Sequence, residues 1–114
     1  MNTYLNRPWE ADPEGIYDFE AALRIWNDFA ILFCLPQVES LTDVHKTKLK
    51  ARLHDTHGIT GWARALSKIR ESHFLQGDNE AKWRADLDFI LEESSFSKLT
   101  KGAYSDLQGV RHEV

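Results

Sequence analysis

Few side chains in this sequence are spaced for catalysis or metal binding. The chain has five histidines and a single cysteine, Cys34. His54 and His57 lie three residues apart around an expected helix end, and no cysteine or carboxylate set completes the four ligands of a zinc site. Asp86 and Asp88 are two positions apart, so on a helix their carboxylates point in different directions and do not share a proton. We therefore predict no metal site, no cofactor and no catalytic residue.

The remaining candidates for chemistry fit structural roles. His45 and His73 fall on the apolar stripes of their expected helices, which predicts histidines at the edge of the core. Cys34 belongs to the apolar run Phe29 to Leu35, which predicts a buried thiol that fills core space. The sequence has no phosphate-binding loop, nucleophile elbow or dinucleotide-binding glycine pattern. The prediction is a protein that is not an enzyme.

Positive charge is concentrated in the middle of the chain. Residues 1–45 hold two basic and eight acidic side chains. Residues 46–70 hold seven basic side chains and one acidic, and residues 71–114 hold five basic and nine acidic. The net charge of the whole chain is −4. If the two helices that carry residues 46–70 lie side by side, these cations could form a basic surface that binds phosphates. The alternative is a solvated face whose cations pair with acids of the first helix. The predicted contact residues for nucleic acid or a partner are Lys46, Lys48, Lys50, Arg52, Arg64, Lys68 and Arg70.

Size and composition indicate one folded domain. The chain has 114 residues, 42% of them hydrophobic, with four Trp and six Phe, which is enough for one modest core. No apolar run approaches the roughly 20 residues that span a bilayer. Residues 1–10 do not have the basic start and apolar middle of a signal peptide. We expect a cytoplasmic protein.

Apolar residues at helical spacing predict four helices and a final helical turn. The first helix should run from Ile16 to Leu35, bury a broad face that includes Leu32, and stop before Pro36. The second should be capped by Ser40 or Thr42, with Asp43 completing a capping box with Ser40, and should end near Thr56 and Gly58. The third should place on one face Ile59, Trp62, Leu66, Ile69 and His73. A fourth, shorter helix should carry Trp83, Leu87, Ile90 and Leu91. A last helical turn should carry Phe96 and Leu99 and close at Gly102.

These patterns predict the fold class and the extent of the domain. No stretch alternates with a period of two, so we expect no sheet. The prediction is an all-α fold, a small single-domain orthogonal bundle of four to five helices over residues 16–106. Residues 1–15 should form a flexible N-terminal arm and residues 107–114 a flexible C-terminal tail.

Short motifs in the chain follow an order that is found in a known family. In the C-terminal half they are Ser72-His73-Phe74-Leu75-Gln76-Gly77, Trp83-Arg84-Ala85-Asp86-Leu87-Asp88-Phe89-Ile90-Leu91, Phe96-Ser97-Lys98-Leu99 and Gly102-Ala103-Tyr104. Upstream they are Trp26-Asn27, Leu35-Pro36-x-Val38, Leu41-Thr42 and Trp62. This order resembles the C-terminal helical domain of phage and prophage DNA replication proteins of the helicase-loader or primosome type. The resemblance covers about residues 16–106.

The same motif residues have a structural interpretation. Phe74, Leu75, Trp83 and Phe96 are expected to be core anchors, and Gly77 and Gly102 turn positions with positive φ. The functional alternative is that three aromatic side chains stay partly exposed beside the basic face and stack on a base or a partner's side chain: Trp83, Phe89 and Tyr104. The chain departs from the family pattern at Phe89, where a second Trp is common, and at Lys101, where an acid is common. Such proteins are also usually longer, with a separate N-terminal DNA-binding domain.

The resemblance implies a replication accessory module. It would bind a replication protein, namely the replicative helicase or a primosome component, with single-stranded DNA as a second ligand. Two alternatives stay open. The basic block and the helix-turn-helix-like junction from Leu53 to Trp62 suggest a direct DNA-binding module. The acidic remainder and the missing second domain suggest a stand-alone phage-encoded regulator or inhibitor that occupies the surface of a host protein.

Overall fold

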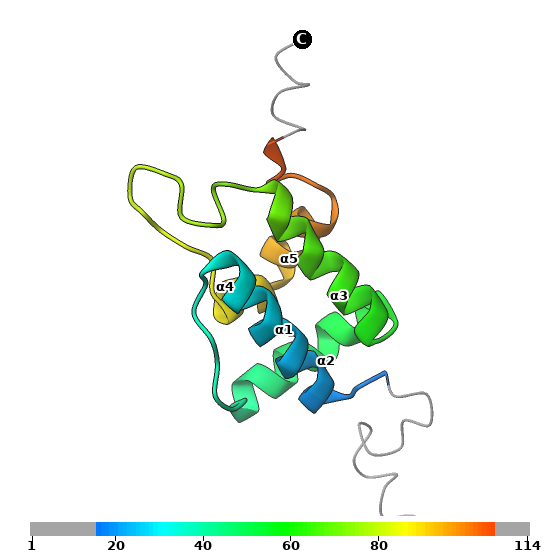
Figure 1. The fold of residues 1–114 in the computed structure, drawn as a ribbon. Coiled ribbons are helices and arrows are strands. Elements are labelled where there is room, and N and C mark those ends of the chain that lie inside the picture. The colour runs from blue at the N-terminus through cyan, green and yellow to red at the C-terminus, as the bar shows by residue number, and fades with distance from the viewer. Residues whose placement is uncertain (1–15, 107–114) are drawn as a thin grey trace, which may run out of the picture.

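The fold is all-α, as predicted. The computed structural model describes residues 16–106, and the predicted arm and tail, residues 1–15 and 107–114, lie outside the described residues. The described chain contains no strand, five α-helices and one 3₁₀ helix (Figure 1). These are α1 (Phe19–Phe33), α2 (Asp43–Thr56), α3 (Ile59–Ser67), the 3₁₀ helix η2 (Lys68–Glu71), α4 (Leu87–Leu91) and α5 (Glu93–Thr100).

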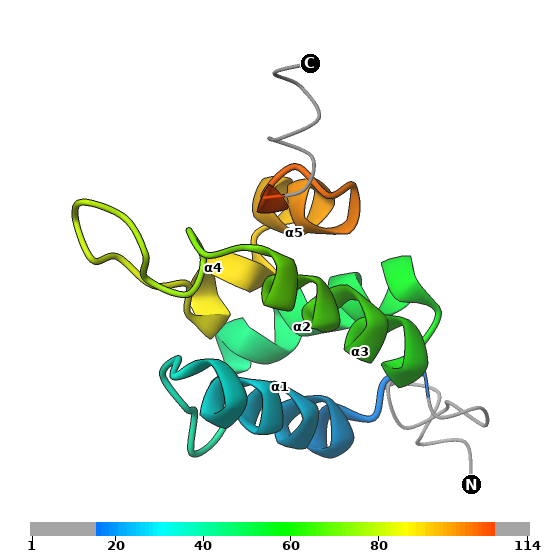
Figure 2. The same ribbon diagram turned by 45° about the horizontal axis from the view of Figure 1, so that its top comes forward.

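Helix α3 is at the centre of the packing. It contacts α1, α2 and α5, while α4 packs on α2 and α5. Figure 2 shows α1 on one side of the molecule and α5 on the other, with α2, α3 and α4 between them. Trp26 of α1 and Trp62 of α3 are completely buried, and the Trp62 ring stacks on Phe96 of α5 at 5.7 Å between centroids. The core therefore joins the first and last helices through α3.

Helix α1 is shorter than predicted at both ends. It begins after Asp18, whose side chain accepts a hydrogen bond from the Ala21 amide at 3.0 Å, and it ends at Cys34. Cys34 has a φ of 60° and caps the helix in the left-handed conformation that glycine usually adopts. Its side chain is exposed, so the prediction of a buried thiol is wrong. The cause is the turn that the chain must make before Pro36, which directs this residue away from the core.

The predicted broad buried face of α1 is only partly buried. Ala22, Trp26 and Ala30 are completely buried, but Leu32 of the expected stripe is 59% exposed, and Ile31 is 62% exposed. The reason is geometric, because α1 packs mainly on α3 and to a lesser extent on α2, which leaves its outer face uncovered.

The junctions around α2 agree with the sequence pattern except in the capping box. Thr42, not Ser40, caps α2, and its capping box uses His45 instead of a carboxylate. The His45 ring also reaches Asp88 at 2.9 Å and is half-buried, which agrees with a histidine at the core edge. His57 ends α2 with a φ of 62°, and Gly58 follows with a φ of 118°.

The third and fourth helices are shorter than the periodicity suggests. α3 ends at Ser67 and continues as η2 only to Glu71, so His73 lies beyond the helix and is exposed, against the prediction of a core-edge histidine. Residues 72–86 form turns and extended backbone, and α4 begins only at Leu87, after the cap at Asp86. Ser72 ends the helix because its buried hydroxyl accepts from the Leu75 amide at 3.1 Å and so competes with helical bonding. Trp83 therefore lies in a loop, and we call residues 72–86 the α3–α4 loop. None of the described helices is long and apolar enough to cross a membrane.

Candidate functional site

Four aromatic rings from the C-terminal half form a closed surface cluster. Trp83 lies 5.3 Å from Phe74 and 4.8 Å from Phe89, edge-on in the second case. Tyr104 lies 5.9 Å from Phe89 and 6.4 Å from Phe74, which completes the circuit. We call these four residues the aromatic quartet. The structure thus brings together the three predicted aromatic contacts and adds a fourth, Phe74, which was expected in the core.

The quartet is open to solvent on one side. Phe74, predicted as a core anchor, is 45% exposed, and Trp83, Phe89 and Tyr104 are half-buried. The neighbouring Leu75 is the anchor instead, because it is completely buried. Phe74 and Leu75 lie in a turn, where only Leu75 enters the core. An exposed large aromatic residue beside other partly exposed rings is the feature that marks a recognition surface.

The α3–α4 loop that carries Phe74 and Trp83 is fixed by hydrogen bonds. Asn79 Nδ2 donates to the carbonyls of Phe74 at 3.1 Å and Trp83 at 2.8 Å, and Asn79 Oδ1 accepts from the Trp83 amide at 3.0 Å. The Ala85 amide donates to the Leu75 carbonyl at 3.0 Å and closes the base of the loop. The loop projects from the helices in Figures 1 and 2. It is therefore a projecting but ordered support for the rings.

The tryptophans differ in what their indole N–H groups contact. Trp26 Nε1 donates to the Pro36 carbonyl at 3.2 Å, and Trp62 Nε1 donates to the Ala22 carbonyl at 3.0 Å. Within residues 16–106, Trp83 Nε1 has no such acceptor, and no buried side-chain nitrogen or oxygen lacks a partner. The Trp83 indole N–H is therefore in contact with solvent. By the same reasoning the Tyr104 hydroxyl is also accessible.

One member of the predicted basic block is buried. Arg52 is only 7% exposed; its Nη1 donates to the Leu91 carbonyl and its Nε to Asp55, both at 3.0 Å. The prediction of Arg52 as a contact for phosphates is wrong, because the guanidinium joins α2 to the end of α4. The sequence contained a signal for this pairing, since Asp55 is the only acid in the block and lies three residues after Arg52.

The other six predicted cations are spread over the molecule. Lys48 of α2 forms an ion pair with Glu92, the residue between α4 and α5. Lys46 and Lys50 line a cavity of about 370 Å³ with Phe19, Asp43 and Thr47, and the Lys50 ammonium lies 5.7 Å above the Tyr17 ring. The remaining three follow from α3 into η2: Arg64 and Arg70, both exposed, and Lys68, half-buried.

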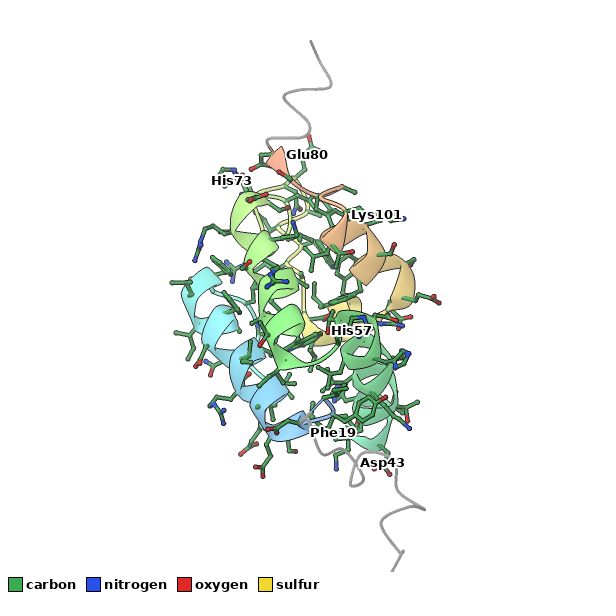
Figure 3. All side chains as sticks on the ribbon, turned by 90° about the vertical axis from the view of Figure 1, so that its right-hand side faces the viewer. Phe19, Asp43, His57, His73, Glu80 and Lys101 are labelled. Carbon is green, nitrogen blue, oxygen red and sulfur yellow. The ribbon has the colours of Figure 1, made fainter. Side chains whose placement is uncertain are left out.

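The quartet is not beside the cavity that Lys46 and Lys50 line. Figure 3 shows Phe19 and Asp43, which line that cavity, at one end of the molecule and His73 and Lys101 at the other. His73 directly precedes Phe74 of the quartet. The expectation that the aromatic contacts flank the basic face therefore does not hold for this pair of lysines.

The charged residues next to the quartet in the sequence are balanced in sign. Within two residues of its members the chain has two basic side chains, Lys82 and Arg84, and two acidic ones, Asp88 and Asp106. Arg84 donates to the Cys34 carbonyl at 3.1 Å, Asp88 contacts the His45 ring, and Asp106 contacts His73. Of these four side chains, three therefore have a partner within the described structure, and Lys82 does not.

The histidines take part in local contacts. Tyr17 OH lies 3.4 Å from His54 Nδ1, and His57 caps α2. Within residues 16–106 no group of three or more His, Cys, Asp and Glu side chains is placed to hold a metal ion.

The motif residues near the N-terminus have clear structural roles. Asn27 Nδ2 donates to the Val38 carbonyl and Asn27 Oδ1 accepts from the Val38 amide, both at 2.8 Å. Together with the bond from Trp26 to Pro36, this pair fixes the connection between α1 and α2. Gly77 and Gly102 have φ values of 101° and 79°, as predicted for turn positions. These motifs therefore specify this fold irrespective of function.

Comparisons of the chain with models of known protein families, with curated proteins and with solved structures give no match.

Proposed function

We propose that this chain is a non-enzymatic cytoplasmic binding module that engages a protein partner through the aromatic quartet. The observation that carries the proposal is the exposed ring of Phe74, held among three half-buried rings at the base of an ordered loop. A few anchor residues, often aromatic, supply most of the free energy in protein interfaces, and anchors in preformed positions bury apolar area at a small cost in entropy. The resemblance to phage replication proteins suggests the partner: the replicative helicase or a primosome component.

Two observations favour a protein over nucleic acid as the main ligand. The charged residues next to the quartet in the sequence balance in sign, whereas phosphate binding needs an excess of cations. The helix-turn-helix interpretation is also disfavoured, because α3 would be the recognition helix, and it is instead packed against α1, α2 and α5. Single-stranded DNA remains a secondary candidate, since bases also stack on exposed rings.

The proposal is tested by titrating the full chain with purified replicative helicase, helicase loader and primase of the encoding host in a calorimeter. The variant Phe74→Ala is expected to weaken binding at least tenfold, because truncation of an interface anchor typically costs about 2 kcal/mol or more. Ile31→Ala is the matched control, since Ile31 is an exposed apolar residue outside the quartet. A complex that is equally strong with both variants would place the interface elsewhere.

A second titration separates the alternatives. Fluorescence anisotropy of labelled single- and double-stranded oligonucleotides at about 50 and 200 mM salt measures any nucleic-acid affinity and its salt dependence. Strong salt-sensitive binding that is lost in Lys46→Glu, with no protein complex, would favour the direct DNA-binding alternative. A complex with a host protein outside replication would favour the regulator or inhibitor.

A further inference from the structure

We infer that the ligand of the aromatic quartet is an extended, proline-rich peptide segment in the polyproline II conformation. The inference rests on the proposed function and specifies the chemistry of the partner at the same surface. Three properties of the surface lead to it: free hydrogen-bond donors among aromatic rings, a preformed shape, and a lack of excess charge.

The first property is the presence of free hydrogen-bond donors in the quartet. Trp26 and Trp62 have their indole N–H groups bound to carbonyls of the fold, at 3.2 and 3.0 Å, as buried tryptophans require. Trp83 instead presents its N–H to solvent within the described part of the chain, and so does the Tyr104 hydroxyl. The quartet thus combines apolar ring faces with two donors at its edge, and its ligand must supply apolar groups and free acceptors together.

A polyproline II segment supplies both. It has no internal hydrogen bonds, so all its carbonyls are free to accept, and proline has no amide that needs an acceptor in return. The quartet offers donors at its edge, and none of its four side chains except Tyr104 has an acceptor. Helices and strands, by contrast, use their backbone carbonyls internally or require a sheet edge. The structure has no strand among the described residues, which leaves no sheet edge there for β-strand addition.

The ring arrangement also suits such a ligand. The Phe74 ring contacts both donor-bearing rings, with centroid separations of 5.3 Å to Trp83 and 6.4 Å to Tyr104. Pyrrolidine rings pack on aromatic faces, and both surfaces are ordered before binding, so little entropy is lost.

The balanced charge favours an uncharged ligand over a nucleic-acid strand. Arg84, Asp88 and Asp106 are partnered within the fold. Lys82 is then the only cation within two residues of a ring that has no partner in the described structure. One lysine gives a phosphate backbone little electrostatic attraction.

The experiment uses the full ¹⁵N-labelled chain and three probes: decaproline, a glycine-serine peptide of the same length, and an oligothymidylate. Two-dimensional NMR spectra resolve one indole N–H signal for each of the four tryptophans. The Trp83→Phe variant assigns the signal of Trp83. Decaproline is expected to shift this signal strongly while the signals of Trp26 and Trp62 stay in place, which provides an internal control for binding at the quartet.

Two conservative variants test the donors. Tyr104→Phe keeps its ring and removes the donor, so it is expected to weaken decaproline binding about five- to tenfold, the effect of one hydrogen bond. Trp83→Phe removes the donor together with part of the ring and is expected to weaken binding at least as much; because its indole signal is absent, its affinity is read from backbone amide signals. Circular dichroism checks that both variants keep the helical fold. Phe74→Ala should abolish the shift of the Trp83 signal, and Ile31→Ala should leave it unchanged.

The outcomes distinguish this inference from the proposed function. No shift with decaproline at millimolar concentration overturns the inference, and so does an equal response to the glycine-serine peptide. A stronger response to oligothymidylate overturns it in favour of nucleic acid. If Phe74→Ala nevertheless breaks the complex with a replication protein, the proposed function stands and only the proline-rich ligand is rejected.

Discussion

Asn79 and Trp83 are joined by a pair of hydrogen bonds that fix the outer part of the α3–α4 loop. The Trp83 amide donates to Asn79 Oδ1 at 3.0 Å, and Asn79 Nδ2 donates back to the Trp83 carbonyl at 2.8 Å. Because the same Nδ2 group also reaches the Phe74 carbonyl, one amide side chain sets the separation of two rings of the quartet. Asn79 contributes no atom to the ring cluster itself, so its role is to position the surface.

The first prediction concerns this positioning. Asn79→Ala should release the loop and weaken binding at the quartet about tenfold, at a local cost of about 1–3 kcal/mol for the unpaired backbone groups. Hydrogen exchange should show faster exchange in residues 73–85 and unchanged rates in α1 and α3. Asp78→Ala is the control, because Asp78 is exposed and adjacent. Equal exchange rates in both variants would contradict the role of Asn79.

The second prediction compares two tryptophans. Trp26→Ala should destabilise the fold by about 3–5 kcal/mol, because the side chain is completely buried and its removal leaves a cavity. Trp83→Ala should cost less than half as much, because Trp83 is half-buried in a surface loop. From the sequence alone both substitutions would be expected to unfold the domain. Urea denaturation of the two variants measures the difference, and equal losses would show that the quartet belongs to the core.

The third prediction concerns the divided basic block. Arg52→Ala should cost about 2–3 kcal/mol, because it removes charge-assisted hydrogen bonds to Asp55 and to the Leu91 carbonyl. Lys46→Ala should change stability by less than about 0.5 kcal/mol, since Lys46 is exposed. Reversing Lys48, Arg52 and Lys68 together to Glu is therefore expected to destabilise the fold and is unsuitable as a test of phosphate binding. Thermal melting monitored by circular dichroism checks all three variants.

The fourth prediction concerns the cap of α1. Cys34→Gly should stabilise the chain by about 1 kcal/mol, because the left-handed conformation at φ 60° costs about that much for a residue with a Cβ atom. Cys34→Ala keeps the Cβ atom and should leave stability nearly unchanged. Native protein should also react with Ellman's reagent at a rate close to that of the unfolded chain, since the thiol is exposed. A thiol that reacts only after denaturation would contradict this exposure.

Sequence periodicity predicted the helices that bury a stripe and missed the places where polar side chains compete with the backbone. α2 was predicted closely because Thr42 and Gly58 bound it at either end. The stripe of α3 seemed to continue to His73, but the hydroxyl of Ser72 ends the helix by bonding to Leu75. The helical spacing of Trp83 with Leu87 was coincidental, since the former is in a loop.

The candidate site was predictable in its residues and not in its arrangement. Trp83, Phe89 and Tyr104 were singled out as aromatic contacts, and they do lie together. The exposure of Phe74 was missed because a one-dimensional pattern does not indicate which of two adjacent apolar residues turns inward. The burial of Arg52 was missed because its main acceptor, the Leu91 carbonyl, is 39 residues away.

Trp26 and Trp62 donate their indole N–H groups to carbonyls inside the fold, whereas the Trp83 N–H faces solvent, and this difference has a consequence for how the domain can evolve. Trp26 and Trp62 contribute to packing and to internal hydrogen bonds, so selection for folding acts strongly at these positions. The α3–α4 loop carries Phe74 and Trp83 on a scaffold of main-chain and Asn79 bonds that does not depend on the identity of either ring. Substitutions at those two positions can therefore alter ligand preference with little effect on the helices, and the domain can acquire a new partner without acquiring a new fold.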